Sequence, residues 1–235
     1  IFSSSIVTSL ILTDSRNAWG GLIIAIPFVL GPLSWFWLLP LLCLALLPLA
    51  FAVFPWFGSD LQFWSRTFVP ESLWSRLSDL RYVQERSLAS TRLSQWQVAI
   101  NLLKERPWLG WGAAAFSVLY PLITGQWHGH AHNLPLEIGV SHGIPVAALI
   151  VIPVISLLII ALQKGVLLPS NQENNFTKVS IFDRAWWTSA FILVLLHGAD
   201  MPLFDSRLNI AGWIFLAGLR CFISAESFNK KRVPN

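Results

Sequence analysis

The segment LSWFWLLPLLCLALLPLAFAVF occupies residues 33–54 and contains no charged side chain. As a helix its 22 residues would be about 33 Å long, which matches the roughly 30 Å hydrocarbon core of a bilayer. Residues 144–163 form a second uncharged stretch of similar length. Both segments therefore predict helices that cross a membrane.

The composition of the whole chain supports this reading. Of the 235 residues, 54% are hydrophobic and only 12% are charged, which is about half the charged share of a typical soluble domain. The 13 tryptophans suit a membrane–water interface. The net charge is +4, but the cations are scattered rather than gathered into a basic stripe, so we expect no nucleic-acid partner.

Five apolar segments predict spans: residues 19–30, 33–54, 144–163, 186–197 and 208–223. Ile1 to Leu12 resembles the tail of another span, and an apolar start without Met is typical of a C-terminal fragment whose earlier spans are missing. We expect an all-α, polytopic transmembrane bundle, with residues 1–235 as one domain. Residues 55–132 hold most of the polar groups and form one large extramembrane loop with amphipathic helices.

The basic tail sets the predicted orientation. Lys230 to Arg232 favours a cytoplasmic C-terminus, because cytoplasmic ends are rich in Lys and Arg. Counting spans backwards places residues 164–184 in the cytoplasm and residues 55–132 outside. Within that outer loop, residues 91–106 predict a helix that starts at a Ser or Thr cap and ends before proline. Its predicted apolar face, which would lie on the membrane or on the bundle, consists of Leu93, Trp96, Ile100 and Leu103.

In this topology Arg16, Arg92 and the His132-Asn133 pair fall on the same outer side. Each has an ordinary alternative role. Arg16 suits a snorkelling anchor at a span end, Arg92 a solvated loop cation, and the histidines a wet loop. His130-x-His132 with Glu137 as the nearest acid is a weak zinc pattern, so we expect no metal. The stretch 200–207 predicts a capped, ion-paired turn between two spans, or a segment that binds a partner.

Three ordered blocks resemble motifs of the O-antigen ligase and polymerase superfamily. The blocks are Ser15-Arg16-Asn17-Ala18-Trp19; Arg92-Leu93 and Trp96 with Pro107-Trp108-Leu109-Gly110-Trp111-Gly112; and His130-Ala131-His132-Asn133-Leu134 with Glu137-Ile138-Gly139 and Gly143. The chain departs from the usual pattern in carrying Asn17 where glycine is common. The stretch from Asp200 to Asn209 further resembles the cyanobacterial IctB family, which is named for bicarbonate transport.

The resemblance implies an enzyme of the bacterial inner membrane that crosses it several times. Such enzymes transfer a glycan from a polyprenyl pyrophosphate to an acceptor hydroxyl on the extracytoplasmic side, without metal or cofactor. His132 would be the base that activates the hydroxyl. Arg16 and Arg92 would hold the diphosphate, because the guanidinium fork binds phosphate oxygens in pairs. Asn133 would orient the imidazole or cap the following helix, with His130 and Glu137 in support.

The IctB name implies an alternative, the transport or accumulation of inorganic carbon. Arginine also binds bicarbonate, so the expected partners are a lipid-linked glycan or bicarbonate, together with membrane lipid. Secondary transporters usually hold their substrate near the bilayer midplane. Here charges within the spans are nearly absent, and Asp200 and Asp205 lie only near a span end. The residues therefore favour glycan transfer over transport, while an inactive scaffold with the same fold is a third reading.

Overall fold

A computed structural model of the chain describes residues 5, 8–10, 12, 15–71, 74–75, 91–163 and 180–232. Every regular element in these ranges is a helix, and none of the described residues forms a strand. The predicted all-α fold is thus confirmed. The predicted span tail at residues 1–12 and the predicted loop at 164–184 lie largely outside the described residues, and the last residues of that loop are helical, because a helix already begins at Ile181.

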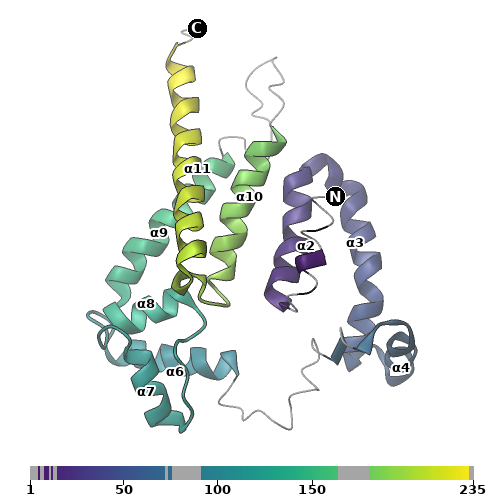
Figure 1. Cartoon of the computed structure of the whole chain (residues 1–235), viewed down its shortest axis with the longest axis horizontal. Helices are drawn as coiled ribbons and strands as arrows, with labels where there is room; N and C mark the ends of the chain where they lie inside the picture. The colour runs from purple at the N-terminus through teal and green to yellow at the C-terminus, as the bar shows by residue number, and fades with distance from the viewer. Residues whose placement is uncertain are drawn as a thin grey trace.

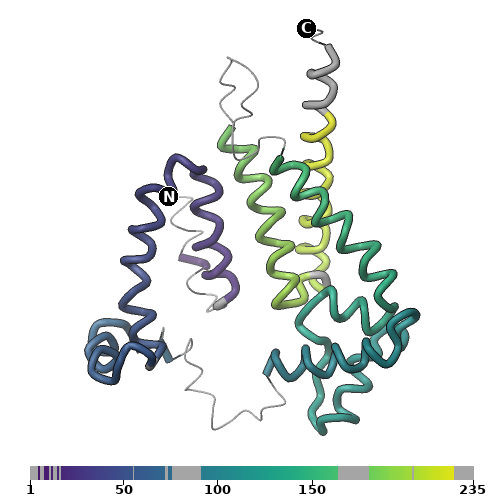
Figure 2. Tube along the Cα trace, turned by 180° about the vertical axis from the view of Figure 1, so that it is seen from behind, coloured from purple at the N-terminus to yellow at the C-terminus, as the bar shows by residue number. Residues whose placement is uncertain are grey.

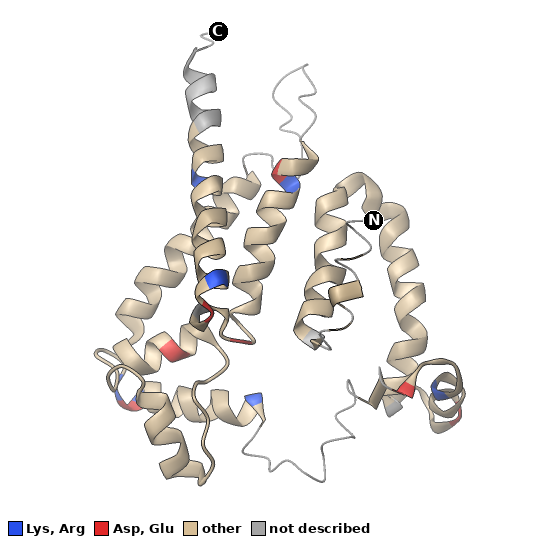
Figure 3. Cartoon of the chain, in the orientation of Figure 1, with Lys and Arg blue, Asp and Glu red and all other residues tan. Residues whose placement is uncertain are grey.

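Three of the described helices are long and apolar enough to cross a membrane: Pro32–Val53 in α3, Ile144–Ala161 in α9, and Ser206–Ser224 in α11. The last of these belongs to a longer helix, α11 (Ser206–Arg232). The predicted spans at 19–30 and 186–197 correspond to two helices that are shorter than these three. They are α2 (Arg16–Leu30) with 15 residues and α10 (Ile181–Leu196) with 16. Figure 3 shows that the charged residues of these helices lie mostly towards their ends.

Helices α2 and α3 form a hairpin around Gly31. The backbone of Gly31 has φ 87°, a conformation that favours glycine, and Pro32 then starts α3. The hydroxyl of Ser34 donates to the Gly31 carbonyl at 2.6 Å. Helix α2 packs along α10, where Phe28 contacts the rings of Trp187 and Phe191. The hairpin is thereby joined to the rest of the bundle through one helix (Figure 1).

Helices α9, α10 and α11 enclose the core of the membrane part. Its buried residues are Leu158, Ala161, Trp187, Ala190, Leu219 and Ile223. Two adjacent tryptophans of α10 bind both neighbouring helices, because the indole of Trp187 donates to Leu158 O at 3.0 Å and that of Trp186 to Phe215 O at 2.9 Å. Each indole thus satisfies its N–H inside an apolar region.

The remaining helices gather at one end of the bundle, opposite the C-terminus (Figures 1 and 2). They are α4 (Ser59–Phe68), α6 (Arg92–Glu105), α7 (Ala115–Thr124) and α8 (Leu134–His142). A second core of small and aromatic residues, including Phe116, Tyr120 and Val140, joins α6, α7 and α8. The side of the membrane on which this end lies stays a prediction.

The apolar face predicted for α6 is wrong in part. The helix begins at Arg92, as expected after the Thr91 cap. It buries Gln95, Ala99 and Leu102, whereas Leu93 is 74% exposed. Apolar spacing identified the helix but only part of its packed side: Leu103 does face α8, close to Gly139, whereas Leu93 does not pack.

Two glycines in the predicted motifs are required by one close contact. The loop 107–112 lies against the end of α8 and the turn into α9, held by bonds from Trp111 N to Val140 O at 2.8 Å and from Ile144 N to Pro107 O at 2.7 Å. A Cβ on Gly110 would lie 2.6 Å from the backbone of α8, and one on Gly143 would overlap the Trp108 carbonyl. Both glycines also have positive φ. These motif glycines therefore fix the helices at this end of the bundle onto α9.

Candidate functional site

The carboxylate of Asp200 is the centre of a polar cluster at the end of the bundle where α6 and α8 lie. Asp200 lies in the connection between α10 and α11, and Met201 N donates to its Oδ1 at 2.9 Å. Oδ1 also lies 3.2 Å from Nδ1 of His132. Asn17 donates to Oδ2 at 3.0 Å, and Arg92 Nη2 lies 3.7 Å from the same oxygen. One carboxylate thus joins side chains from three distant parts of the chain.

Arg92 and Asn17 both lie in the first turn of a helix. The Thr91 hydroxyl caps α6 by accepting from Ser94 N, and Ser15 caps α2 by accepting from Ala18 N. Asn17 bridges the two groups, because its amide donates to Asp200 and its oxygen accepts from Arg92 Nη1 at 3.4 Å. Helix N-termini carry partial positive charge, so this geometry favours anions.

His132 has a backbone conformation that is uncommon for a residue with a side chain. Its φ is 49°, which lies in the left-handed region. Strain of this kind persists only where the surroundings impose it, and it is common at functional sites. An ionised Asp200 can only accept in the hydrogen bond between its Oδ1 and His132 Nδ1. A neutral His132 therefore carries its proton on Nδ1, and its Nε2 is left as a lone-pair acceptor. Nε2 has no hydrogen-bond partner among the described residues, and the ring is 29% exposed.

Asn133 holds the loop with His132 against the end of α10. Its oxygen caps α8 by accepting from Leu136 N at 3.0 Å, and its amide donates to Gly198 O at 2.9 Å. Leu134 N donates to His197 O at 2.8 Å beside it. Asn133 was predicted either to orient the imidazole of His132 or to cap the following helix. It caps α8, and Asp200 is the residue that orients the imidazole.

His130 and Glu137 support the same loop from within. Ala131 N donates to Glu137 Oε2 at 2.9 Å, and burial raises the pKa of this carboxyl. The ring of His130 lies 4.2 Å from that of His132, edge to face, and stacks on Phe204. Burial lowers the pKa of His130, and the neighbouring His132 lowers it further. His130 is therefore held neutral beside the imidazole that it packs against.

The electrostatics of the cluster keep Asp200 ionised. Burial opposes the charge, but the Met201 N–H, the His132 ring and the Arg92 guanidinium outweigh it and hold the pKa of Asp200 below its usual value. An ionised Asp200 can accept from His132 and pair with Arg92 at once. Among the described residues no three His, Cys, Asp or Glu side chains are placed to hold a metal ion.

A known protein family matches most of the chain. The family model of O-antigen ligase matches residues 1–151, well over half of the chain. The chain belongs to the O-antigen ligase family. Neither a curated protein nor a solved structure matches it. Family membership and the apolar helices together make it a membrane protein.

The structure brings together two of the three site residues predicted from the ligase motifs. Arg92 and His132 contact the same carboxylate. The backbone of Arg16 starts α2, next to Asn17 in the cluster, but its side chain lies outside what the structure describes. The histidine loop therefore belongs to a polar cluster and is not simply a wet surface loop.

Two residues of the cluster were not predicted. Asp200 was expected in a capped turn, a role that Asp205 takes by accepting from Arg207 N at 2.9 Å. Asn17 appeared only as a departure from the ligase motif. An acid at the end of an apolar span is a functional candidate by default, and that signal would have found Asp200, which lies beyond the matched residues 1–151.

Proposed function

We propose that this O-antigen ligase family member transfers a glycan from a polyprenyl pyrophosphate to an acceptor hydroxyl on the extracytoplasmic side. The observation that carries the proposal is the Asp200–His132 pair, with Nδ1 and Oδ1 3.2 Å apart. This pair selects the tautomer whose Nε2 can take a proton. A sugar hydroxyl is a weak nucleophile at neutral pH and needs such a base within hydrogen-bond reach.

In the proposed step, Nε2 of His132 removes the proton of the acceptor hydroxyl. The hydroxyl oxygen forms a bond to the anomeric carbon of the donor sugar. The bond from that carbon to the phosphate oxygen breaks, and its electron pair leaves with the lipid pyrophosphate. Asp200 stays ionised and stabilises the imidazolium that forms, as an acid partner does in other triads.

The leaving pyrophosphate needs positive charge, which Arg92 and, as the motifs imply, Arg16 would supply. Arg92 is 42% exposed although it pairs with Asp200, so a ligand has access to its guanidinium. Three helices, α2, α6 and α8, begin at the cluster. Their N-termini add partial positive charge where the leaving group would develop its negative charge.

The test uses the full-length protein in a strain that lacks the native gene. His132→Ala should abolish the cell-envelope glycan that the wild type restores, because removing a catalytic base commonly costs about 10²–10⁴-fold in rate. His142→Ala is the matched control, since His142 is an exposed histidine at the end of α8. Equal glycan profiles of the His132 variant and the wild type would contradict the proposal.

Inorganic carbon transport remains the competing function, and a second measurement separates it. Purified protein in proteoliposomes, without lipid-linked sugar, should show no saturable uptake of labelled bicarbonate if the protein is a transferase. Saturable uptake, with an unchanged envelope glycan profile in the deletion strain, would replace the transferase proposal with transport.

A further inference from the structure

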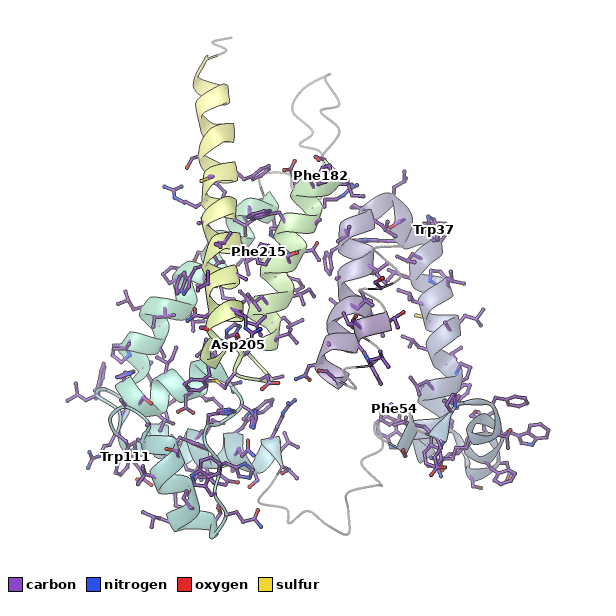
Figure 4. The ribbon with its side chains drawn as sticks, viewed as in Figure 1. Trp37, Phe54, Trp111, Phe182, Asp205 and Phe215 are labelled. Atoms are coloured by element: carbon purple, nitrogen blue, oxygen red, sulfur yellow. The ribbon has the colours of Figure 1, made fainter. Side chains whose placement is uncertain are left out.

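A largely apolar pocket of about 260 Å³ lies among α8, α9, α10 and α11. Four residues of α9 line it, Ile150, Val151, Val154 and Ile155, together with residues from the stretches 190–194 of α10, 208–216 of α11 and 134–138 of α8. In Figure 4, Phe215 labels the part of α11 that carries these lining residues, and Asp205 lies just before the helix begins. An apolar cavity of about 150 Å³ already stays dry and binds benzene, so this pocket has room for a length of hydrocarbon.

Two polar side chains, His197 and Asn209, interrupt the apolar lining. His197 Nδ1 lies 2.6 Å from Leu193 O, so Nδ1 carries the proton and donates, and Nε2 is an acceptor. Neither Nε2 nor the Asn209 amide bonds another group in the described part of the chain. The lining contains no Lys, Arg, Asp or Glu. The pocket thus offers hydrogen bonds but no counter-charge.

The pocket is separate from the Asp200 cluster. None of Arg92, His132 or Asp200 lines it. Between the two lies the junction in which Leu134 N binds His197 O and Asn133 binds Gly198 O. The outer sides of α9 and α11, which are candidate spans, would face lipid. A ligand would therefore enter from the bilayer rather than from the site.

We propose that this pocket binds the hydrocarbon chain of a membrane lipid alcohol, whose hydroxyl donates to His197 Nε2 and accepts from the Asn209 amide. A hydroxyl can do both at once. A charged headgroup would lose its hydration here without gaining a partner, which is costly. Because Leu134, His197 and Gly198 belong to both the pocket and the junction, the bound lipid supports from behind the loop that carries His132. The proposal does not depend on glycan transfer.

The test uses full-length protein in detergent and two photoreactive probes. One is a 16-carbon alcohol with a diazirine in its chain, and the other is the same chain ending in a methyl group. Peptides of α9 and α11 should be labelled by the alcohol saturably, and unlabelled hexadecanol should compete. Ile155→Trp, which fills the pocket, should lower labelling roughly tenfold. Ile152→Trp, at a residue of the same helix that is 62% exposed and does not line the pocket, should leave it unchanged.

The polar end has its own test. Asn209→Leu should lower labelling by the alcohol about two- to tenfold, the worth of one hydrogen bond, and leave the methyl-ended probe unaffected. Labelling that does not saturate, and that is equal in the Ile155 variant and the wild type, would mean that the probe reacts only as lipid surrounding the protein and not as a ligand in the pocket. Absence of labelling would mean that another part of the protein fills the pocket. Equal labelling by both probes would show that the hydroxyl of the alcohol contributes nothing to binding. Each of these results overturns the proposal.

Discussion

Replacing Asp200 by asparagine tests the centre of the site with almost no change in shape. The carboxylate accepts from Met201 N, His132 and Asn17 and pairs with Arg92. Asparagine keeps one acceptor oxygen but places an NH₂ group at the other position. If that group faces Asn17 and Arg92, donors oppose donors. If it faces His132, Nδ1 must become an acceptor, and the proton moves to Nε2, the atom proposed as the base.

The expected loss in rate is large, and the expected loss in stability is small. In a serine protease triad, the corresponding change of acid to amide costs about 10⁴-fold through the wrong tautomer, so we expect about 10³–10⁴-fold here. The lost ion pair contributes little to folding, because Arg92 and Asp200 are both more than 40% exposed and such pairs are worth about 0.2–1 kcal/mol. The assay compares restored envelope glycan with the thermal midpoint of the purified protein.

Asp205→Asn is the control, because Asp205 lies in the same connection but accepts only from the start of α11. It should restore glycan normally. An Asp200→Asn variant with a rate within about threefold of wild type would refute the tautomer argument, since no amide can replace the carboxylate at both oxygens. Equal losses in both variants would point instead to a general fault in the connection.

Substitutions at three further residues test the cluster and the loop that carries His132. Arg92→Lys keeps the charge but not the fork that reaches both Asn17 and Asp200; we expect a glycan-transfer rate about 10–100-fold lower with an unchanged thermal midpoint. Asn133→Ala loses the α8 cap and the bond to Gly198 O, and should lower the free energy of unfolding by about 1–3 kcal/mol in denaturant titration; Asn133→Asp, which retains the cap, should lose less. Glu137→Gln concerns pH. Burial raises the Glu137 pKa above 4.5 in the folded protein, so the folded state binds the proton more tightly, and wild-type stability falls as pH rises from the unfolded to the folded pKa. Thermal midpoints of the Gln variant should lack this fall, and equal pH dependence in both proteins would contradict the assignment.

The sequence could predict the helices that depend on length and composition alone. The segment expected at 33–54 forms α3 from Pro32 to Val53, and that at 144–163 begins α9 at the expected Ile144. Uncharged runs of this length have few alternatives, because a bilayer leaves the backbone no other way to satisfy its hydrogen bonds. Even so, α11 extends to Arg232, well past the predicted end.

Packing could not be predicted in the same way. Leu93 was expected on the buried side of α6, yet α8 contacts the side with Ala99. The pairing of Asp200 with His132 depends on how α10 meets the start of α8, which spacing along the chain does not contain. The ligase motifs pointed to Arg92 and His132, but the family match ends at residue 151, and the resemblance of residues 200–209 to the IctB family gave Asp200 no role in the site.

The strength of the contacts suggests how the site works. Besides the Ala131–Glu137 bond, neutral and partly buried contacts hold the histidine loop in place: the Asn133–Gly198 and Leu134–His197 hydrogen bonds and the glycine contacts of the loop 107–112. The Arg92–Asp200 pair is exposed and at 3.7 Å is long for a hydrogen-bonded pair, so exchanging Asp200 for a phosphate oxygen would cost the fold at most about 1 kcal/mol. A diphosphate could therefore take Arg92 while His132 keeps its partner on the other carboxylate oxygen. The division between a rigid neutral junction and a weak ion pair would let the site bind an anion without losing the proposed base.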